Sequence, residues 1–202
     1  MKKLTFVLFL AALVGLAFTD PVEVVSYKVD ASNSQVEWLA KKVTGQHNGS
    51  VALEEGNLEY TDGRLSGGKF VVDMTSITVL DLQGNMKGKL EGHLKSPDFF
   101  AIEEFPTATF EITKVVPRGV PGEYKVEGDL TVKGITKEIT VPIIKMEESE
   151  DGIKTVEAIN LTLDRTDFDV RYGSGTFFSN LGDKTIYDDF ELTINVVANK
   201  AM

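Results

Sequence analysis

The side chains most often used in catalysis are scarce in this sequence. The chain has no cysteine and only two histidines, His47 and His93, which are far apart and lack the spacing of zinc ligands. The run Gly173-Ser174-Gly175 lacks the spacing of the nucleophile elbow of hydrolases. We therefore expect a protein that is not an enzyme, with no cofactor and no metal ion. We expect both histidines to be exposed to solvent or to form ordinary hydrogen bonds.

Three aspartates close in sequence, Asp164, Asp167 and Asp169, are the remaining candidates for a metal site. Carboxylate oxygens suit calcium, but the EF-hand loop also needs a glycine and a terminal glutamate at fixed positions, which this stretch lacks. A small barrel enzyme would instead need a buried acid–base pair, and the sequence offers no convincing one. We interpret these aspartates as part of an acidic loop in contact with water.

Aromatic side chains are frequent where loops are expected. Phe99, Phe100 and Phe105 occur in one stretch, and Phe168, Phe177 and Phe178 occur in a later one. Burying one such side chain is worth ~1.5–3 kcal/mol, so leaving all of them in water would be costly. They are expected either to cap the core or to contact an apolar ligand, and the residue types alone leave both open.

The first aromatic stretch has the signals of a short helical plug between two strands. Ser96 is a good N-cap and Pro97 suits the first helical position, which predicts a helical turn over residues 96–104. Pro106 cannot continue a helix, and strict alternation starts at Thr107. A further short helix is expected over residues 90–94.

Alternating apolar and polar residues predict about eight amphipathic strands. They span residues 34–43, 50–61, 66–79, 107–116, 123–133, 137–146, 153–163 and 186–198, with a short additional strand over 26–30. A change of parity near Gly56 predicts a β-bulge, and residues 45–49 are expected to form a turn carrying His47. Residues 164–184 read as a loop. This pattern indicates an all-β antiparallel sandwich or barrel, which strand spacing alone does not separate.

The apolar faces of these strands are the candidate interior wall. Alternation places the following side chains on it: Trp38, Phe70, Val72, Met74, Phe110, Leu130, Val132, Leu192 and Ile194. Together with Phe99, Phe100, Phe105, Phe168, Phe177 and Phe178 they form the predicted ligand-binding set.

Three segments resemble the signatures of the YceI-like family of lipid- and polyisoprenoid-binding proteins. They are residues 96–110, residues 128–137 (Gly-Asp-Leu-Thr-Val-Lys-Gly-Ile-Thr-Lys) and residues 164–168 (Asp-Arg-Thr-Asp-Phe). The resemblance extends from Tyr27 to Ala198. It departs from the family pattern at Asp169, where the family more often has glycine.

This resemblance implies a lipocalin-like, eight-stranded antiparallel β-barrel with a short helical plug. It also implies a binding protein for a long apolar lipid, such as a polyisoprenoid or a quinone-like molecule, held inside the barrel. An interaction module with a packed interior and no ligand would have the same sequence pattern, and a small barrel enzyme is a further alternative. The resemblance leaves a homodimer open.

The N-terminus has the three-part layout of a secretory signal peptide. Lys2 and Lys3 form a basic start, residues 4–18 are apolar, and Gly15-Leu16-Ala17 offers a small-residue cleavage site. The apolar run is shorter than the ~20 residues that span a bilayer. We expect residues 1–17 to be a signal peptide and residues 18–202 to form one YceI-like barrel domain. The mature protein would be periplasmic or secreted, without stable membrane insertion.

The charge balance disfavours polyanionic partners such as nucleic acids and anionic membrane surfaces. The formal net charge is −10, and loss of Lys2 and Lys3 with the signal peptide would make it −12. An acidic surface is repelled by nucleic acids. Nucleic acid is therefore not an expected partner.

Cleavage at the predicted site places the mature N-terminus at or near Phe18. Purification from the cell envelope or culture medium of the native host, followed by N-terminal sequencing, tests this expectation. A membrane-bound protein that still carries Lys2 and Lys3 would contradict it.

Overall fold

The computed structural model describes residues 22–201, so the expected signal peptide lies outside the described residues. The strands are β1 (Val24–Val29), β2 (Gln35–Lys42), β3 (Gly45–Thr61), β4 (Arg64–Val79), β5 (Thr107–Pro117), β6 (Glu123–Val132), β7 (Ile135–Glu148), β8 (Lys154–Asp164) and β9 (Ile186–Lys200). The helices are α1 (Gly84–Lys95) and the short 3-10 turns η1 (Ala31–Asn33), η2 (Arg165–Phe168) and η3 (Gly182–Lys184).

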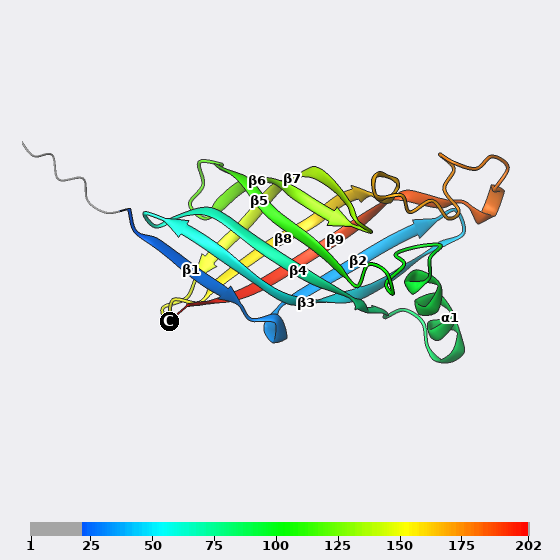
Figure 1. Cartoon of the computed structure of the whole chain (residues 1–202), viewed down its shortest axis with the longest axis horizontal. Coiled ribbons are helices and arrows are strands. Elements are labelled where there is room, and N and C mark those ends of the chain that lie inside the picture. Colours follow the sequence, from blue (N-terminus) through cyan, green and yellow to red (C-terminus); the bar gives the residue numbers. More distant parts are fainter. Residues whose placement is uncertain (1–21, 202) are drawn as a thin grey trace, which may run out of the picture.

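The strands close into an antiparallel barrel (Figure 1). Each strand from β2 to β9 pairs with the next, and β9 pairs back onto β2. β1 pairs with the far end of β3 and the end of β9, so β1 and β2 occupy one strand position, interrupted by η1. The nine strands therefore fill eight positions, which confirms the predicted eight-stranded all-β barrel.

The predicted strands agree with those of the structure in most places, with one error at the start of β3. The register between β3 and β4 shifts between Leu53 and Glu55, which confirms the bulge expected beside Gly56. The predicted turn over residues 45–49 is wrong, because β3 already begins at Gly45 and His47 pairs with Ala40 of β2. Polar residues there hid the strand. This part of the hairpin is held by the backbone ladder and does not need an apolar face.

The barrel end away from α1 is filled by side chains. Leu58 and Val126 are almost completely buried there, within a cluster of apolar residues from nearly all strands. Lys154 closes this end, with its ammonium group 5.2 Å from the ring centroid of Tyr27 and 4.7 Å from that of Tyr60. Burial raises the pKa of the Tyr60 hydroxyl, which stays protonated. This half of the interior is a packed core.

The short helix predicted over residues 90–94 is confirmed, but it is the last part of a longer helix that begins earlier in the chain. α1 spans Gly84–Lys95, and Ser96 ends it by donating its backbone N–H to the carbonyl of His93. Residues 96–104 form consecutive turns, so Ser96 is a C-terminal cap and the predicted N-cap is wrong. Three glycines within α1 each disfavour a helix by roughly 1 kcal/mol, which masked the full length of the helix in the sequence.

Contacts with the barrel stabilise α1 in spite of these glycines. Leu90 and Leu94 pack on the cluster of Trp38, Ile77 and Val79 at the barrel end. The Glu91 carboxylate accepts hydrogen bonds from the backbone N–H of Val79 (2.9 Å) and the hydroxyl of Thr78 (2.7 Å). These hydrogen bonds, led by that from Val79, lower the pKa of Glu91 below its usual value. Glu91 therefore anchors α1 over one mouth of the barrel.

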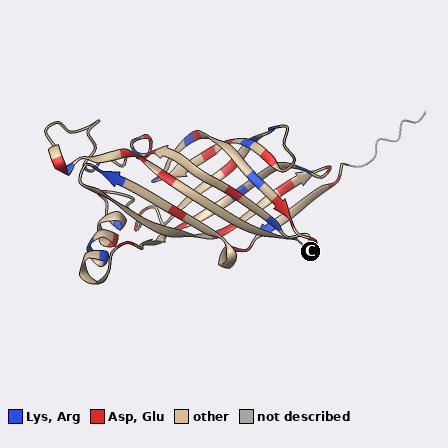
Figure 2. Cartoon of the chain, turned by 180° about the vertical axis from the view of Figure 1, so that it is seen from behind, with Lys and Arg blue, Asp and Glu red and all other residues tan. Residues whose placement is uncertain are grey.

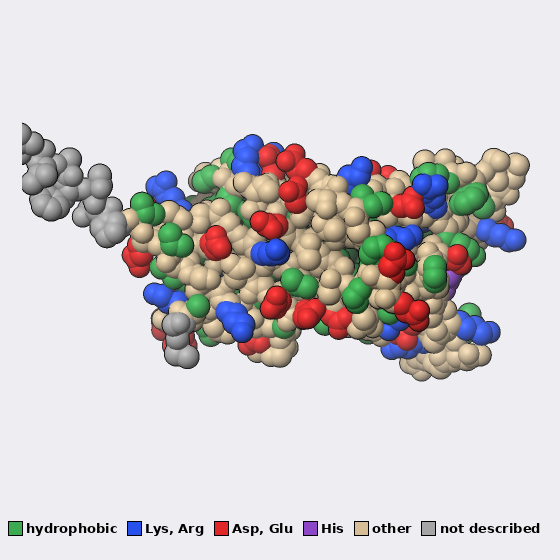
Figure 3. Space-filling model, viewed as in Figure 1, with side chains coloured by type: hydrophobic (Ala, Val, Ile, Leu, Met, Phe, Trp, Pro, Cys, Tyr) green, Lys and Arg blue, Asp and Glu red, His purple; other side chains and the backbone are tan. Residues whose placement is uncertain are grey.

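Lysine, arginine, aspartate and glutamate residues are spread along the strands and on α1 (Figure 2). The space-filling view shows acidic and basic groups interspersed on the visible face of the barrel (Figure 3). No helix within residues 22–201 is long and apolar enough to cross a membrane.

Replacing Glu91 with alanine should release α1 while leaving the barrel folded. The loss of hydrogen bonds to a charged group should lower the local free energy of opening by about 1–3 kcal/mol. Amide hydrogen exchange should quicken in α1 and change little in β6 and β7. Glu103→Ala, an exposed carboxylate on the neighbouring turns, is the control.

The stabilisation of α1 by the Glu91 carboxylate should also depend on pH in a defined direction. The folded pKa of Glu91 lies below its unfolded value, so its contribution is complete above that unfolded value, about 4.5, and is lost as pH falls through the lower folded pKa. Equal α1 exchange rates in wild type and Glu91→Ala at neutral pH would contradict this role.

Candidate ligand-binding site

A cavity lies inside the barrel at the end covered by α1. Its volume is about 160 Å³. The residues that line it are Val36, Trp38, Ala40, Val51, Val72, Met74, Ile77, Leu94, Phe99, Phe100, Ala108, Leu130, Val132, Leu163, Arg165, Phe168, Val170, Ile186, Tyr187, Phe190 and Leu192. Only Trp38, Arg165 and Tyr187 among them carry a side-chain nitrogen or oxygen, so the cavity is almost wholly apolar.

Because side chains alternate along a strand, most of the lining side chains point into the barrel. β2 contributes Val36, Trp38 and Ala40, and β9 contributes Phe190 and Leu192, each set two residues apart. In β4 the inward parity changes from Met74 to Ile77. Asp73 terminates the regular pairing there: its side chain bonds Thr75, and its carbonyl accepts a bond from Ser76. The irregular stretch turns Ile77 into the cavity.

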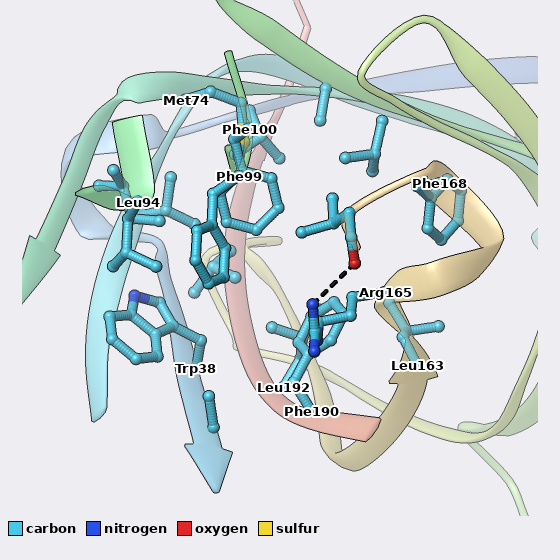
Figure 4. A pocket seen from close by; sticks show the side chains of 18 of the residues that line it. Trp38, Met74, Leu94, Phe99, Phe100, Leu163, Arg165, Phe168, Phe190 and Leu192 are labelled. Carbon is cyan, nitrogen blue, oxygen red and sulfur yellow. Dashed lines mark hydrogen bonds between the residues drawn. The ribbon is translucent and has the colours of Figure 1, made fainter. Parts of the chain in front are cut away.

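The roof consists of Leu94 from α1 and of Phe99 and Phe100 from the turns that follow it (Figure 4). Backbone hydrogen bonds from Phe99 to Ser96 and from Phe100 to Leu94 hold these turns. The ring of His93 meets those of Phe99 and Tyr172 edge-on, with centroids 4.9 and 4.4 Å apart. The roof therefore joins α1 to the loop between β8 and β9.

Arg165 brings a buried charge to the edge of this cavity. Its guanidinium donates to the carbonyls of Val170 (2.7 Å), Tyr187 and Ile186, and to Asp188 (3.1 Å) (Figure 4 shows the bond to Val170). Burial lowers the pKa of Arg165, and the charge of Asp188 acts in the opposite sense. The group ties together the two ends of the β8–β9 loop, so its first task is structural.

Asp169 shows how the chain fits its departure from the family pattern. It ends η2 in the left-handed conformation with φ of 57°, a region that glycine enters without strain and that aspartate tolerates better than most residues. Its carbonyl accepts a hydrogen bond from Lys133. Asp164 caps η2 through the backbone N–H of Thr166. These aspartates therefore shape the loop.

The structure brings part of the predicted ligand-binding set together. The predicted residues that line the cavity are Trp38, Val72, Met74, Phe99, Phe100, Leu130, Val132, Phe168 and Leu192. Whether they contact a ligand remains a prediction.

The other predicted residues lie elsewhere. Phe70, Phe110 and Ile194 pack against the core cluster of the filled half, because the strands run past the cavity. Phe105 packs on Gly134 in the turn between β6 and β7. Phe177 and Phe178 are 41% and 49% exposed on the β8–β9 loop, where Arg171 lies over the ring of Phe177.

Sequence reasoning missed several lining residues. Those with a readable signal are Val36, Ala40, Ala108 and Phe190, which share parity with neighbouring predicted residues. Those that depend on the tertiary arrangement are Val51, Ile77, Leu94, Leu163, Arg165, Val170, Ile186 and Tyr187. Arg165 was inside a recognised motif, but its burial could not be read from the sequence.

The histidines sit apart from the cavity interior. His47 bonds Asp81 through Nδ1 at 2.8 Å, and His93 lies 3.7 Å from Asp98. Within residues 22–201, no group of three or more potential ligands is arranged to hold a metal ion.

Solved structures share this fold. BcnA of Burkholderia cenocepacia is 22% identical with a TM-score of 0.67, over 85% of this chain and 99% of that chain. A polyisoprenoid-binding domain from Saccharophagus degradans is 13% identical with a TM-score of 0.62, over 88% and 99% of the two chains. The Campylobacter jejuni YceI protein is 16% identical with a TM-score of 0.52, over 100% of both. At these identities the likeness establishes the fold.

Sequence comparison identifies relatives and a matching protein family. A UPF0312 protein of Staphylococcus aureus strain N315 is 31% identical over 121 residues, which cover 58% of this chain and 64% of the relative. The match thus spans less than two thirds of that relative. The sequence model of the YceI-like domain matches residues 27–198, nearly the whole described barrel. With its closed barrel and apolar cavity, the chain therefore belongs to the YceI-like domain family.

Proposed function

We propose that this protein is an exported, non-catalytic binding protein for a long apolar lipid of the isoprenoid class. The observation that carries the proposal is the almost wholly apolar cavity at one end of a barrel that is otherwise packed. Membership of the YceI-like family and the fold shared with a polyisoprenoid-binding domain support it. The periplasm or the extracellular medium is the proposed location, on the strength of the N-terminal sequence.

The cavity sets how much of such a lipid is enclosed. Its volume of about 160 Å³ is close to the ~150 Å³ of an engineered cavity that binds benzene. Each methylene group removed from water contributes ~0.8 kcal/mol. One ring or one isoprene unit fits within the barrel as it stands. A longer chain requires Leu94, Phe99 and Phe100 to move away from the mouth.

Replacing small side chains that line the cavity with larger ones should block binding of the lipid. Val72→Trp and Val132→Trp place a large ring where the lipid would lie, so affinity for an apolar fluorescent probe and for a polyprenyl lipid should fall at least tenfold. Stability in urea should change by less than about 1 kcal/mol, because the ring fills the cavity and displaces no protein side chain. Val116→Trp, on an exposed position of β5, is the matched control.

The opposite pattern would identify a packed interaction module. In that case the wild type binds no probe, organic extracts of protein from the native host contain no lipid, and both substitutions cost ~1–3 kcal/mol through overpacking. That combination would overturn the proposed function.

A further inference from the structure

Exposed apolar side chains gather at the end of the barrel that holds the cavity. Tyr172, Phe177 and Phe178 of the β8–β9 loop are about half exposed, and Met86 of α1 is 61% exposed. No other aromatic side chain within residues 22–201, apart from Tyr187 beside the loop, is as exposed as these three rings. Grouped apolar side chains on a surface commonly mark an interaction site, because contact with water is unfavourable for them.

Three segments carry these side chains, and all of them lie around the mouth of the cavity. α1 and the β8–β9 loop project from the same end of the barrel in both opposite views (Figures 1 and 2). The tip of the β2–β3 hairpin joins them, because the backbone N–H of Val43 donates to the carbonyl of Thr185 (3.1 Å). We call the exposed apolar side chains of these segments the mouth patch: Val43, Met86, Tyr172, Phe177 and Phe178.

The β8–β9 loop holds its rings outward through defined contacts. The backbone N–H groups of Phe177 and Phe178 both donate to the carbonyl of Ser174, at 3.3 and 3.0 Å, and Ser174 is completely buried. The guanidinium of Arg171 lies 4.7 Å from the ring centroid of Phe177. The exposure of these rings is therefore a property of the folded loop.

The charges around the mouth patch differ from those of the whole acidic chain. No acidic residue occurs over residues 171–182 of the loop or over residues 38–53, which include the hairpin tip. The one carboxylate of α1, Glu91, bonds to the barrel. Each segment also supplies a lysine: Lys42, Lys89 and Lys184. Figure 3 shows basic and apolar side chains together at this end.

We propose that the mouth patch docks the protein on the surface of a membrane that contains anionic phospholipid. Aromatic rings are favourable at the level of the lipid head groups, and each nearby lysine or arginine is attracted to anionic lipids. The choice of a membrane as the partner rests on the proposed function, because a long apolar lipid reaches the cavity from a bilayer. Docking is peripheral and places the cavity mouth against the bilayer.

Vesicle sedimentation tests the apolar part of the surface. Purified protein should bind vesicles of phosphatidylglycerol and phosphatidylcholine, and the double variant Phe177→Ser with Phe178→Ser should bind them at least tenfold more weakly. Val116→Ser with Val120→Ser is the matched control, because it removes two exposed apolar side chains at the opposite end. This control should change the affinity by less than twofold.

The basic part of the surface is tested on the same vesicles. Lys89→Gln and Lys184→Gln should each weaken binding about fivefold, the effect of one lysine near an anionic surface. Binding should also fall as salt is raised. Lys28→Gln, an exposed lysine at the opposite end, is the control. Equal binding to vesicles of phosphatidylcholine alone would overturn the role of anionic lipid.

The orientation can be measured directly because the chain has no cysteine. A polarity-sensitive fluorophore on Ser179→Cys, beside the rings, should shift its emission to the blue when vesicles are added. The same fluorophore on Glu150→Cys, in the β7–β8 turn at the opposite end, should not shift. Equal shifts at both positions would overturn docking through the mouth patch.

Further outcomes separate this proposal from the proposed function. Val72→Trp should abolish binding of the apolar probe and leave vesicle binding within twofold, whereas the Phe177 and Phe178 double variant should show the reverse pattern. Probe binding by a wild type that binds no vesicles would overturn docking alone. Vesicle binding without probe binding would overturn the proposed function alone. A loss of self-association in the double variant, seen by analytical ultracentrifugation with no change in vesicle binding, would assign the patch to a second copy of the chain and overturn the membrane as partner.

Discussion

The interior volume of an eight-stranded barrel is the constraint on which this structure depends. At that strand number the side chains just fill the space, or leave room for one slender ligand. In this chain one end of the barrel is filled by side chains and the other end contains a cavity. Leu58, Tyr60, Val126 and their neighbours fill the end that Lys154 closes, whereas smaller inward residues at the other end, such as Ala40 and Ala108, leave a cavity.

Two elements outside the strand ladder, α1 and the β8–β9 loop, cover the cavity end, and contacts with the barrel keep them in place. α1 has three glycines and little intrinsic helical stability, so it depends on Leu90, Leu94 and the Glu91 anchor. The β8–β9 loop depends on the buried guanidinium of Arg165. A roof secured by a few hydrogen bonds opens at a lower free energy than a strand ladder does. The same architecture thus combines a rigid wall with a roof that opens more easily than the wall.

The polar groups at this cavity differ in how completely they are satisfied. Arg165 is surrounded by acceptors, and its bonds organise the loop. The ring of Trp38 lies on the backbone of β3 at Gly49, and its indole nitrogen has no hydrogen-bond partner within residues 22–201. An apolar pocket gives affinity through contact area but discriminates poorly between ligands of similar shape.

The sequence by itself determined the all-β class, the number of strand positions, the bulge in β3 and much of the inward wall, because these follow from alternation and local turn chemistry. It also placed Trp38, Val72, Val132 and Leu192 on inward faces. Only the tertiary structure decided where the cavity lies along those faces, since parity gives direction but not height in the barrel. Phe70 and Ile194 share the parity of lining residues and yet pack in the filled half. The extent of α1, the burial of Arg165 and the unpaired nitrogen of Trp38 were likewise decided by contacts between segments distant in the chain, which local sequence preferences do not encode.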